Sequence, residues 1–183
     1  GGFKHYMLKE IHEQPDALTD TLRGRVDFEN AQVYLDELNL SQTDVDAIQR
    51  IAIVACGTAW HSALIGKFLI ETLARVPVEV DYGSEFRYRE QLLGRETAVL
   101  AITQSGETAD TLAPMEQAVE RGLRTLAICN TPGSRAAQIA DGTLFSQCGP
   151  EIGVASTKCF VGQLACLHML GLFLGLRKGT LSS

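Results

Sequence analysis

The chain has 183 residues, and its 16 Lys and Arg against 22 Asp and Glu leave a formal net charge of −6. This length suits one hydrophobic core or two small ones, and 45% hydrophobic with 21% charged residues excludes a disordered chain. The acidic balance argues against a nucleic-acid-binding surface. The five cysteines are scattered without a C-x-x-C pair, which indicates reduced thiols in a cytoplasmic protein.

Neither a leader nor a membrane span is expected. The chain begins Gly1-Gly2 without an initiator Met, and no basic-then-apolar leader follows, so we expect a piece of a longer protein without a secretory signal. The stretch from Phe160 to Leu176 is almost wholly apolar. It is shorter than the roughly 20 residues of a membrane span, and it contains polar side chains. We therefore predict a buried helix there and no contact with a membrane.

Residues 1–49 are predicted to form a helical linker segment. One helix is predicted over 5–13 and a second over 15–23, because Pro15 suits a first helical turn. Ser41 with Asp44 resembles a capping box, which predicts a third helix.

Residues 50–183 are predicted to form a second domain in which strands and helices alternate. Continuous apolar runs of strand length are typical of parallel strands that are buried on both faces. The predicted strands are 51–55, 78–81, 97–103, 125–129 and 142–146. The predicted helices are 59–74, 84–91, 108–121, one from about 134, and 157–176. Helical spacing places Trp60, Leu64, Phe68 and Thr72 on one stripe, and Leu112, Met115 and Val119 on an inward face.

This alternation predicts an α/β fold, a three-layer αβα sandwich around a five-stranded parallel sheet. Right-handed crossovers make the flavodoxin-like strand order 2-1-3-4-5 the expected one. In that order the first and third strands are neighbours, and the winding direction reverses between them. Ligands bind beyond the carboxyl ends of the strands at such a point. The loops after residues 55 and 103 are therefore the first candidates for a site.

The loop after the third strand carries three hydroxyls, an amide and a glycine just before a predicted helix. Free backbone N–H groups and the helix dipole make such a position suitable for an anion. The loop has no Lys or Arg, and the chain lacks the Walker and G-x-G-x-x-G motifs, which favours a small phosphate ester over a nucleotide. Helix capping by Ser105 or Thr108 is the alternative. The candidate residues are Thr103, Gln104, Ser105 and Thr108.

Two further loops have similar chemistry. Cys56, Gly57 and Thr58 follow the first strand; Gly57 permits close approach of a ligand, whereas Cys56 alone is most often a small buried residue. The loop after the fifth strand is rich in turn residues, and it contains Glu151 as a candidate base and Lys158 as a candidate anion contact. Four scattered His and the Cys set show no ligand spacing, so we predict no metal and no cofactor.

Three motifs resemble one enzyme family. C-G-T at 56–58, T-Q-S-G-E-T-A-D-T at 103–111 and P-E-I-G-V-A-S-T-K at 150–158 are similar to those of the isomerising glutamine–fructose-6-phosphate aminotransferases, or glucosamine-6-phosphate synthases. The resemblance extends over nearly the whole chain, including H-Y-M-L-K-E-I-H-E-Q-P at 5–15. S-G-x-T alone would indicate only the wider sugar-isomerase (SIS) superfamily.

The resemblance implies a role for each candidate residue. Thr103, Gln104, Ser105 and Thr108 would hold the phosphate of fructose 6-phosphate. Thr58, the Val154 backbone and Ser156 would hold the sugar hydroxyls, with Cys56 lining the pocket. This chain has Thr103 where the family usually has Ser, which keeps a hydroxyl, and Ala59 where the family has Ser, which removes one.

The resemblance also implies what surrounds the chain. It matches the linker after a glutaminase domain and the first SIS domain. The proton-abstracting Glu, the ring-opening His and the Schiff-base Lys of the family come from the second SIS domain and the carboxy-terminal tail. We therefore expect that this chain forms half of a hexose 6-phosphate site, which binds the sugar phosphate without turnover. No catalytic residue is expected within this chain. The expected partners are a second SIS domain and a glutaminase domain.

Two other functions are open alternatives. The first is a sugar-phosphate-sensing SIS module of a transcriptional regulator, which would carry a basic helix-turn-helix at its amino flank. The second is a free-standing isomerase of phosphorylated sugars. We also expect a homodimer, because the helix over 160–176 is apolar on nearly every face and one sheet covers only one side of it. In the competing arrangement the amino-terminal helices fold back over this strip.

Overall fold

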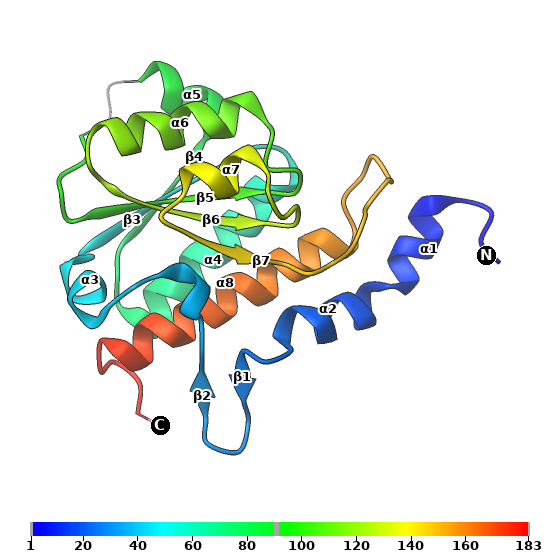
Figure 1. Cartoon of the computed structure of the whole chain (residues 1–183), viewed down its shortest axis with the longest axis horizontal. Coiled ribbons are helices and arrows are strands. Elements are labelled where there is room, and N and C mark those ends of the chain that lie inside the picture. Colours follow the sequence, from blue (N-terminus) through cyan, green and yellow to red (C-terminus); the bar gives the residue numbers. More distant parts are fainter. Residues whose placement is uncertain (1, 90–91, 183) are drawn as a thin grey trace.

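The computed structural model describes residues 2–89 and 92–182. A five-stranded parallel sheet lies between two layers of helices (Figure 1). Its strands are β3 (Arg50–Ala55), β4 (Val78–Tyr82), β5 (Thr97–Thr103), β6 (Arg124–Cys129) and β7 (Gly142–Phe145). Their order across the sheet is β4-β3-β5-β6-β7, which is the predicted 2-1-3-4-5. The α/β sandwich expected from the sequence is thus confirmed.

Each face of the sheet packs against its own helices, because side chains alternate along a strand. Ile51 and Ile53 of β3 join the core under α4 (Thr58–Ala74) and α8 (Lys158–Arg177). Ala52 and Val54 join the core on the other face. The helices of that second face are α5 (Gly83–Tyr88), α6 (Ala109–Glu120) and α7 (Arg135–Ile139). The last two residues of the helix predicted over 84–91 lie outside the described residues.

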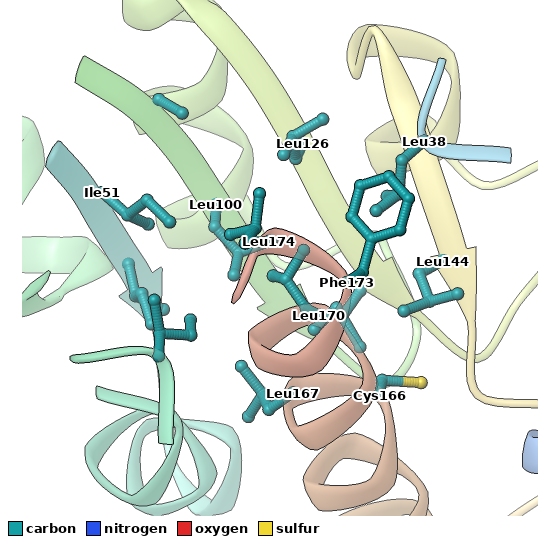
Figure 2. Packing of buried hydrophobic residues seen from close by; sticks show 14 of the residues in the cluster. Leu38, Ile51, Leu100, Leu126, Leu144, Cys166, Leu167, Leu170, Phe173 and Leu174 are labelled. Carbon is teal, nitrogen blue, oxygen red and sulfur yellow. The ribbon is translucent and has the colours of Figure 1, made fainter. Parts of the chain in front are cut away.

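The central core element is α8. Figure 2 shows its apolar side chains packed on the sheet around Ile51, Leu100, Leu126 and Leu144. By length and a mean hydropathy of 1.9 this helix could cross a membrane, but 61% of its apolar window is buried inside the chain. Burial of this extent is what a core helix of a globular domain shows, in agreement with the helix predicted from the sequence.

The amino-terminal segment contains more than the predicted helices. It forms α1 (Tyr6–His12), α2 (Gln14–Leu22), the antiparallel strand pair β1 (Val26–Asp27) and β2 (Gln32–Val33), the 3-10 helix η1 (Asp36–Leu38) and α3 (Gln42–Ala47). The strand pair and η1 were not predicted. Ser41 and Asp44 form the predicted capping box at the start of α3.

This segment folds back along α8 (Figure 1). Thr21 of α2 donates a hydrogen bond to the Ser146 carbonyl, and Arg25 Nη1 donates to the Phe145 carbonyl at 2.8 Å. Between Lys158 and Arg177, all of which are described, only His168 and Arg177 are exposed. The apolar strip that we expected to remain open is therefore covered within one chain, as in the competing arrangement.

Two predicted helix faces each contain one exposed residue, whereas Leu112 and Met115 pack in the core as predicted. Phe68 of α4 is 67% exposed and Val119 of α6 is 48% exposed, although both were placed on apolar stripes. The buried face of α4 is instead made by small residues such as Ala59, Ala63 and Gly66. Small side chains let α4 approach α8 closely, because helices pack ridge into groove and a Cβ at Gly66 would overlap Leu167.

Candidate functional site

A cavity of about 220 Å³ lies beyond the carboxyl ends of β3 and β5, where the winding of the sheet reverses. Every predicted site residue except Gly57 and Lys158 lines it. Its walls are Cys56, Thr58, Ala59, Ile102, Thr103, Gln104, Ser105, Thr108, Thr111, Glu151, Gly153, Val154, Ser156 and Gln163. Three separate loops thus meet at the place where the fold predicts a ligand.

Three larger hollows lie elsewhere and have less suitable surroundings. One of about 410 Å³ lies at the opposite ends of the strands, where Arg124 is already bonded to Asp44. A second, of about 830 Å³, is an open groove beside β4, and a third, of about 380 Å³, lies against the start of α1. None of the three contains the hydroxyl-rich loop or lies at the carboxyl ends of the strands, so the smaller cavity is the candidate site.

The loop over 103–108 is held from its outer side. The Gln104 carbonyl accepts from Asn130 N at 3.2 Å, and the Gly106 carbonyl accepts from Ala136 N at 3.0 Å. Thr103 Oγ1 accepts from Gly106 N at 3.1 Å, and Ser105 Oγ accepts from Glu107 N at 3.2 Å, which closes the loop on itself. These bonds fix the turn while its hydroxyls line the cavity.

Thr108 does not cap its helix through its side chain. It is the N-cap residue of the twelve-residue helix α6, yet its side chain makes no capping hydrogen bond. An N-cap threonine ordinarily accepts from a backbone N–H of the first turn. Thr108 lines the cavity, and its hydroxyl does not make the capping bond considered from the sequence.

The acidic residue of this loop is turned away from the cavity. Glu107 Oε1 accepts a hydrogen bond from Arg135 N at 2.8 Å, at the start of α7. Its charge therefore faces the amino end of another helix, where a carboxylate is favourable. An anion in the cavity would not meet this carboxylate directly.

The loop after β3 contributes a thiol, a hydroxyl and a methyl group. Cys56 is half-buried and receives a weak hydrogen bond from Thr111 Oγ1 at 3.9 Å. Gly57 is the N-cap of α4 with φ of +59°, and it brings Thr58 and Ala59 to the cavity wall. Ala59 presents only a methyl group at the position where the resemblance implies a serine.

Glu151 is a capping residue in this structure. Its carboxylate accepts from Thr157 N at 2.8 Å, Cys159 N at 3.2 Å and the hydroxyls of Thr157 and Ser156 at 3.1 Å each. Burial tends to raise the pKa of Glu151, but the hydrogen bonds from Thr157 and Cys159 outweigh it, and the pKa is lowered. A lowered pKa and occupied oxygens oppose the general-base role considered from the sequence.

Lys158 does not face the cavity. It is buried at the start of α8, and its Nζ donates to Glu13 Oε2 at 2.7 Å. The sequence suggested an anion contact because Lys158 follows the loop motif directly. Helical geometry turns its side chain toward the amino-terminal segment instead, where it neutralises a carboxylate of the chain itself.

Thr111 and Gln163 line the cavity but were not predicted. Thr111 lies three residues after Thr108, so the helical repeat could have placed it on the same side of α6. Gln163 is a buried polar residue in an otherwise apolar helix, and its Oε1 accepts from Ser62 Oγ at 2.9 Å. Within 2–89 and 92–182, no group of three or more His, Cys, Asp or Glu is arranged to hold a metal ion.

Comparison with known proteins shows the family to which this chain belongs. The profile of the SIS domain matches residues 46–172. The chain belongs to the SIS domain family. It is 49% identical over 183 residues to glutamine–fructose-6-phosphate aminotransferase (isomerizing) of Caldanaerobacter subterraneus subsp. tengcongensis, covering 100% of this chain and 30% of that protein. The match in Symbiobacterium thermophilum is 52% over 179 residues, which is 98% of this chain and 29% of that protein.

A solved structure agrees with the sequence relatives. The chain superposes on the C-terminal domain of glucosamine-fructose-6-phosphate aminotransferase from Francisella tularensis with a TM-score of 0.91 and 37% identity, covering 99% of this chain and 50% of that one. These similarities confirm the resemblance identified from the motifs. The chain spans about 30% of the length of the curated relatives that it matches.

Proposed function

We propose that this SIS domain binds a hexose 6-phosphate, and specifically fructose 6-phosphate, as the first sugar-binding half of an isomerising glutamine–fructose-6-phosphate aminotransferase. The observation that carries this proposal is the uncommitted Thr108 hydroxyl among the donors of the 103–108 loop, at the amino end of α6. Neutral hydroxyls, an amide and helix N–H groups can together hold a phosphate dianion.

The cavity chemistry favours a small, exchangeable phosphate ester. None of the described residues lining it is Lys or Arg, so no full positive charge compensates the dianion. On the opposite wall, Ser156 Oγ donates to Glu151 and keeps its lone pairs for a sugar hydroxyl. Thr58 and the backbone at Val154 supply further polar groups for the sugar. Groups suited to a phosphate and groups suited to a polyol line one cavity, which supports a hexose phosphate as the ligand.

We expect Ser105→Ala to weaken binding of fructose 6-phosphate by about 1–3 kcal/mol, because the phosphate would lose a hydroxyl donor and the Glu107 N–H would lose its acceptor. Isothermal titration calorimetry on the purified chain measures the change. Ser41→Ala is the matched control, since Ser41 caps α3 and does not line the cavity. Equal affinity of the Ser105 variant and the parent would show that the phosphate site is assigned incorrectly.

The proposed context is the longer protein. We propose that residues 1–49 link this domain to a glutaminase domain, that residues 50–183 form the SIS domain, and that a second SIS domain completes the isomerase in a cytoplasmic homodimer. The homodimer rests on the family resemblance and not on the apolar strip of α8, which the amino-terminal segment covers. The relatives' alignments support this context, because they extend over the amino-terminal segment as well as the SIS match. A regulator module, with a basic helix-turn-helix at that flank, is less consistent with this alignment.

We expect the isolated chain to bind without turnover. The resemblance places the base, the ring-opening His and the Schiff-base Lys outside these residues, and Glu151 is committed to helix capping. The purified chain is incubated with fructose 6-phosphate and ammonia, and glucosamine 6-phosphate is measured by mass spectrometry. A full-length relative serves as the positive control. Enzyme-dependent product from this chain alone would contradict the half-site proposal.

A further inference from the structure

The loop over 150–157 is tied at its middle to a carboxylate from outside the SIS match. Glu10 of α1 is 3% exposed, and its Oε1 accepts from Ile152 N at 2.6 Å and from Gly153 N at 3.1 Å. Its Oε2 also accepts from Gly153 N at 3.1 Å. Two consecutive backbone N–H groups therefore converge on one buried carboxylate, an arrangement that fixes the backbone at this point.

A second tie lies at the end of the same loop. Lys158, 5% exposed, donates to Glu13 Oε2 at 2.7 Å, and Glu13 also pairs with Lys9 at 3.0 Å. The two ties from the amino-terminal segment bracket the stretch that contains Val154 and Ser156. Both of those residues line the cavity.

The anchoring by Glu10 differs from that by Glu151. Glu151 belongs to the loop and caps α8, so it secures the exit of the loop. Glu10 lies more than 140 residues away in sequence and secures the turn just before Val154. Charge-assisted bonds to a buried carboxylate are strong, and an unpaired buried carboxylate is costly, so this contact strongly favours one loop conformation.

We infer that Glu10 is a positioning residue for sugar recognition: it holds the 150–157 loop so that the Val154 backbone and Ser156 face the cavity. This inference rests on the proposed hexose-phosphate site. It gives the segment before the SIS domain a part in shaping the site, beyond its role as a linker. The phosphate loop over 103–108 is anchored separately, by the loop after β6 and by α7, so Glu10 acts on the sugar end of the ligand.

The test compares Glu10→Ala with Asp16→Ala, which removes an exposed carboxylate from the same segment. Binding of fructose 6-phosphate and of inorganic phosphate to the whole chain is measured by NMR titration. We expect Glu10→Ala to weaken fructose 6-phosphate binding about tenfold and to leave inorganic phosphate binding unchanged. Glu10→Gln keeps the size and one carbonyl acceptor, and we expect it to restore part of the affinity. Asp16→Ala should match the parent for both ligands.

Amide hydrogen exchange at Ile152 and Gly153 provides a readout that needs no ligand. We expect these two amides to lose protection in Glu10→Ala and to keep it in Asp16→Ala. Unchanged fructose 6-phosphate affinity, an equal loss for both ligands, or retained protection of the two amides would each overturn the inference. If Glu10→Ala does not fold, Glu10→Gln takes its place in both measurements. A parent chain that binds no hexose phosphate would refute the proposed function, and the exchange result would still decide whether Glu10 holds the loop.

Discussion

Replacing Gly106 by Ala is expected to abolish measurable hexose-phosphate binding and to lower the free energy of unfolding by about 3 kcal/mol or more. Gly106 has φ of +72°, a backbone region that is unfavourable for residues with a Cβ. A Cβ there would also overlap the Ser134 hydroxyl and lie 2.9 Å from Cys129 Sγ. Relief of this overlap requires the 103–108 loop to move away from β6 and α7, which displaces the donors of the phosphate site.

Gly122→Ala is the matched control for Gly106→Ala. Gly122 has nearly the same φ, +69°, but a Cβ there would meet no atom within 4 Å. It therefore incurs the backbone penalty without the overlap. Chemical denaturation and calorimetry on both variants separate the two effects, and we expect the Gly122 variant to bind fructose 6-phosphate like the parent. Equal destabilisation and full binding in both variants would refute the close-packing explanation.

Replacing Glu151 by Ala is expected to destabilise the domain by about 2–4 kcal/mol, because the start of α8 and the 150–157 loop would lose their shared acceptor. The Thr157 and Cys159 N–H groups would be left without this partner at the start of the principal core helix. We also expect weaker fructose 6-phosphate binding, since Ser156 would be free to rotate. Urea denaturation measures the first effect and calorimetry the second. Glu29→Ala removes an exposed carboxylate elsewhere and is the control.

The contribution of Glu151 is expected to depend on pH with a defined sign. Burial works to raise its pKa, but the hydrogen bonds prevail and the folded-state pKa lies below the ordinary 4.5. A lowered folded-state pKa means that the stabilisation is fully present above pH 4.5 and is lost as the pH falls through the folded-state value. The stability difference between the parent and Glu151→Gln should therefore be constant from pH 7 to about 5 and shrink on further acidification. A difference that grows in acid would contradict this assignment.

The sequence by itself determined the sheet, its strand order and the loops that meet at its carboxyl edge. These follow from features that are local or nearly so: continuous apolar runs for buried parallel strands, helices of crossover length between them, and the handedness of the crossovers. The T-Q-S-G-E-T loop was predicted as an anion site because its residues are consecutive, so their meeting at the start of α6 needs no tertiary information. The same holds for the capping box of Ser41 and Asp44.

Only the tertiary structure decided which side chains meet across long distances in the chain. Lys158 turned from the cavity to Glu13, and Phe68 turned outward, because the faces of α8 and α4 are set by the elements packed against them. From the sequence, Glu10 is an ordinary acidic residue on a short helix. Its contact with the 150–157 loop forms only because α2 folds back along α8 and brings α1 to that loop. Such contacts depend on packing between surfaces, which residue spacing along one element does not specify.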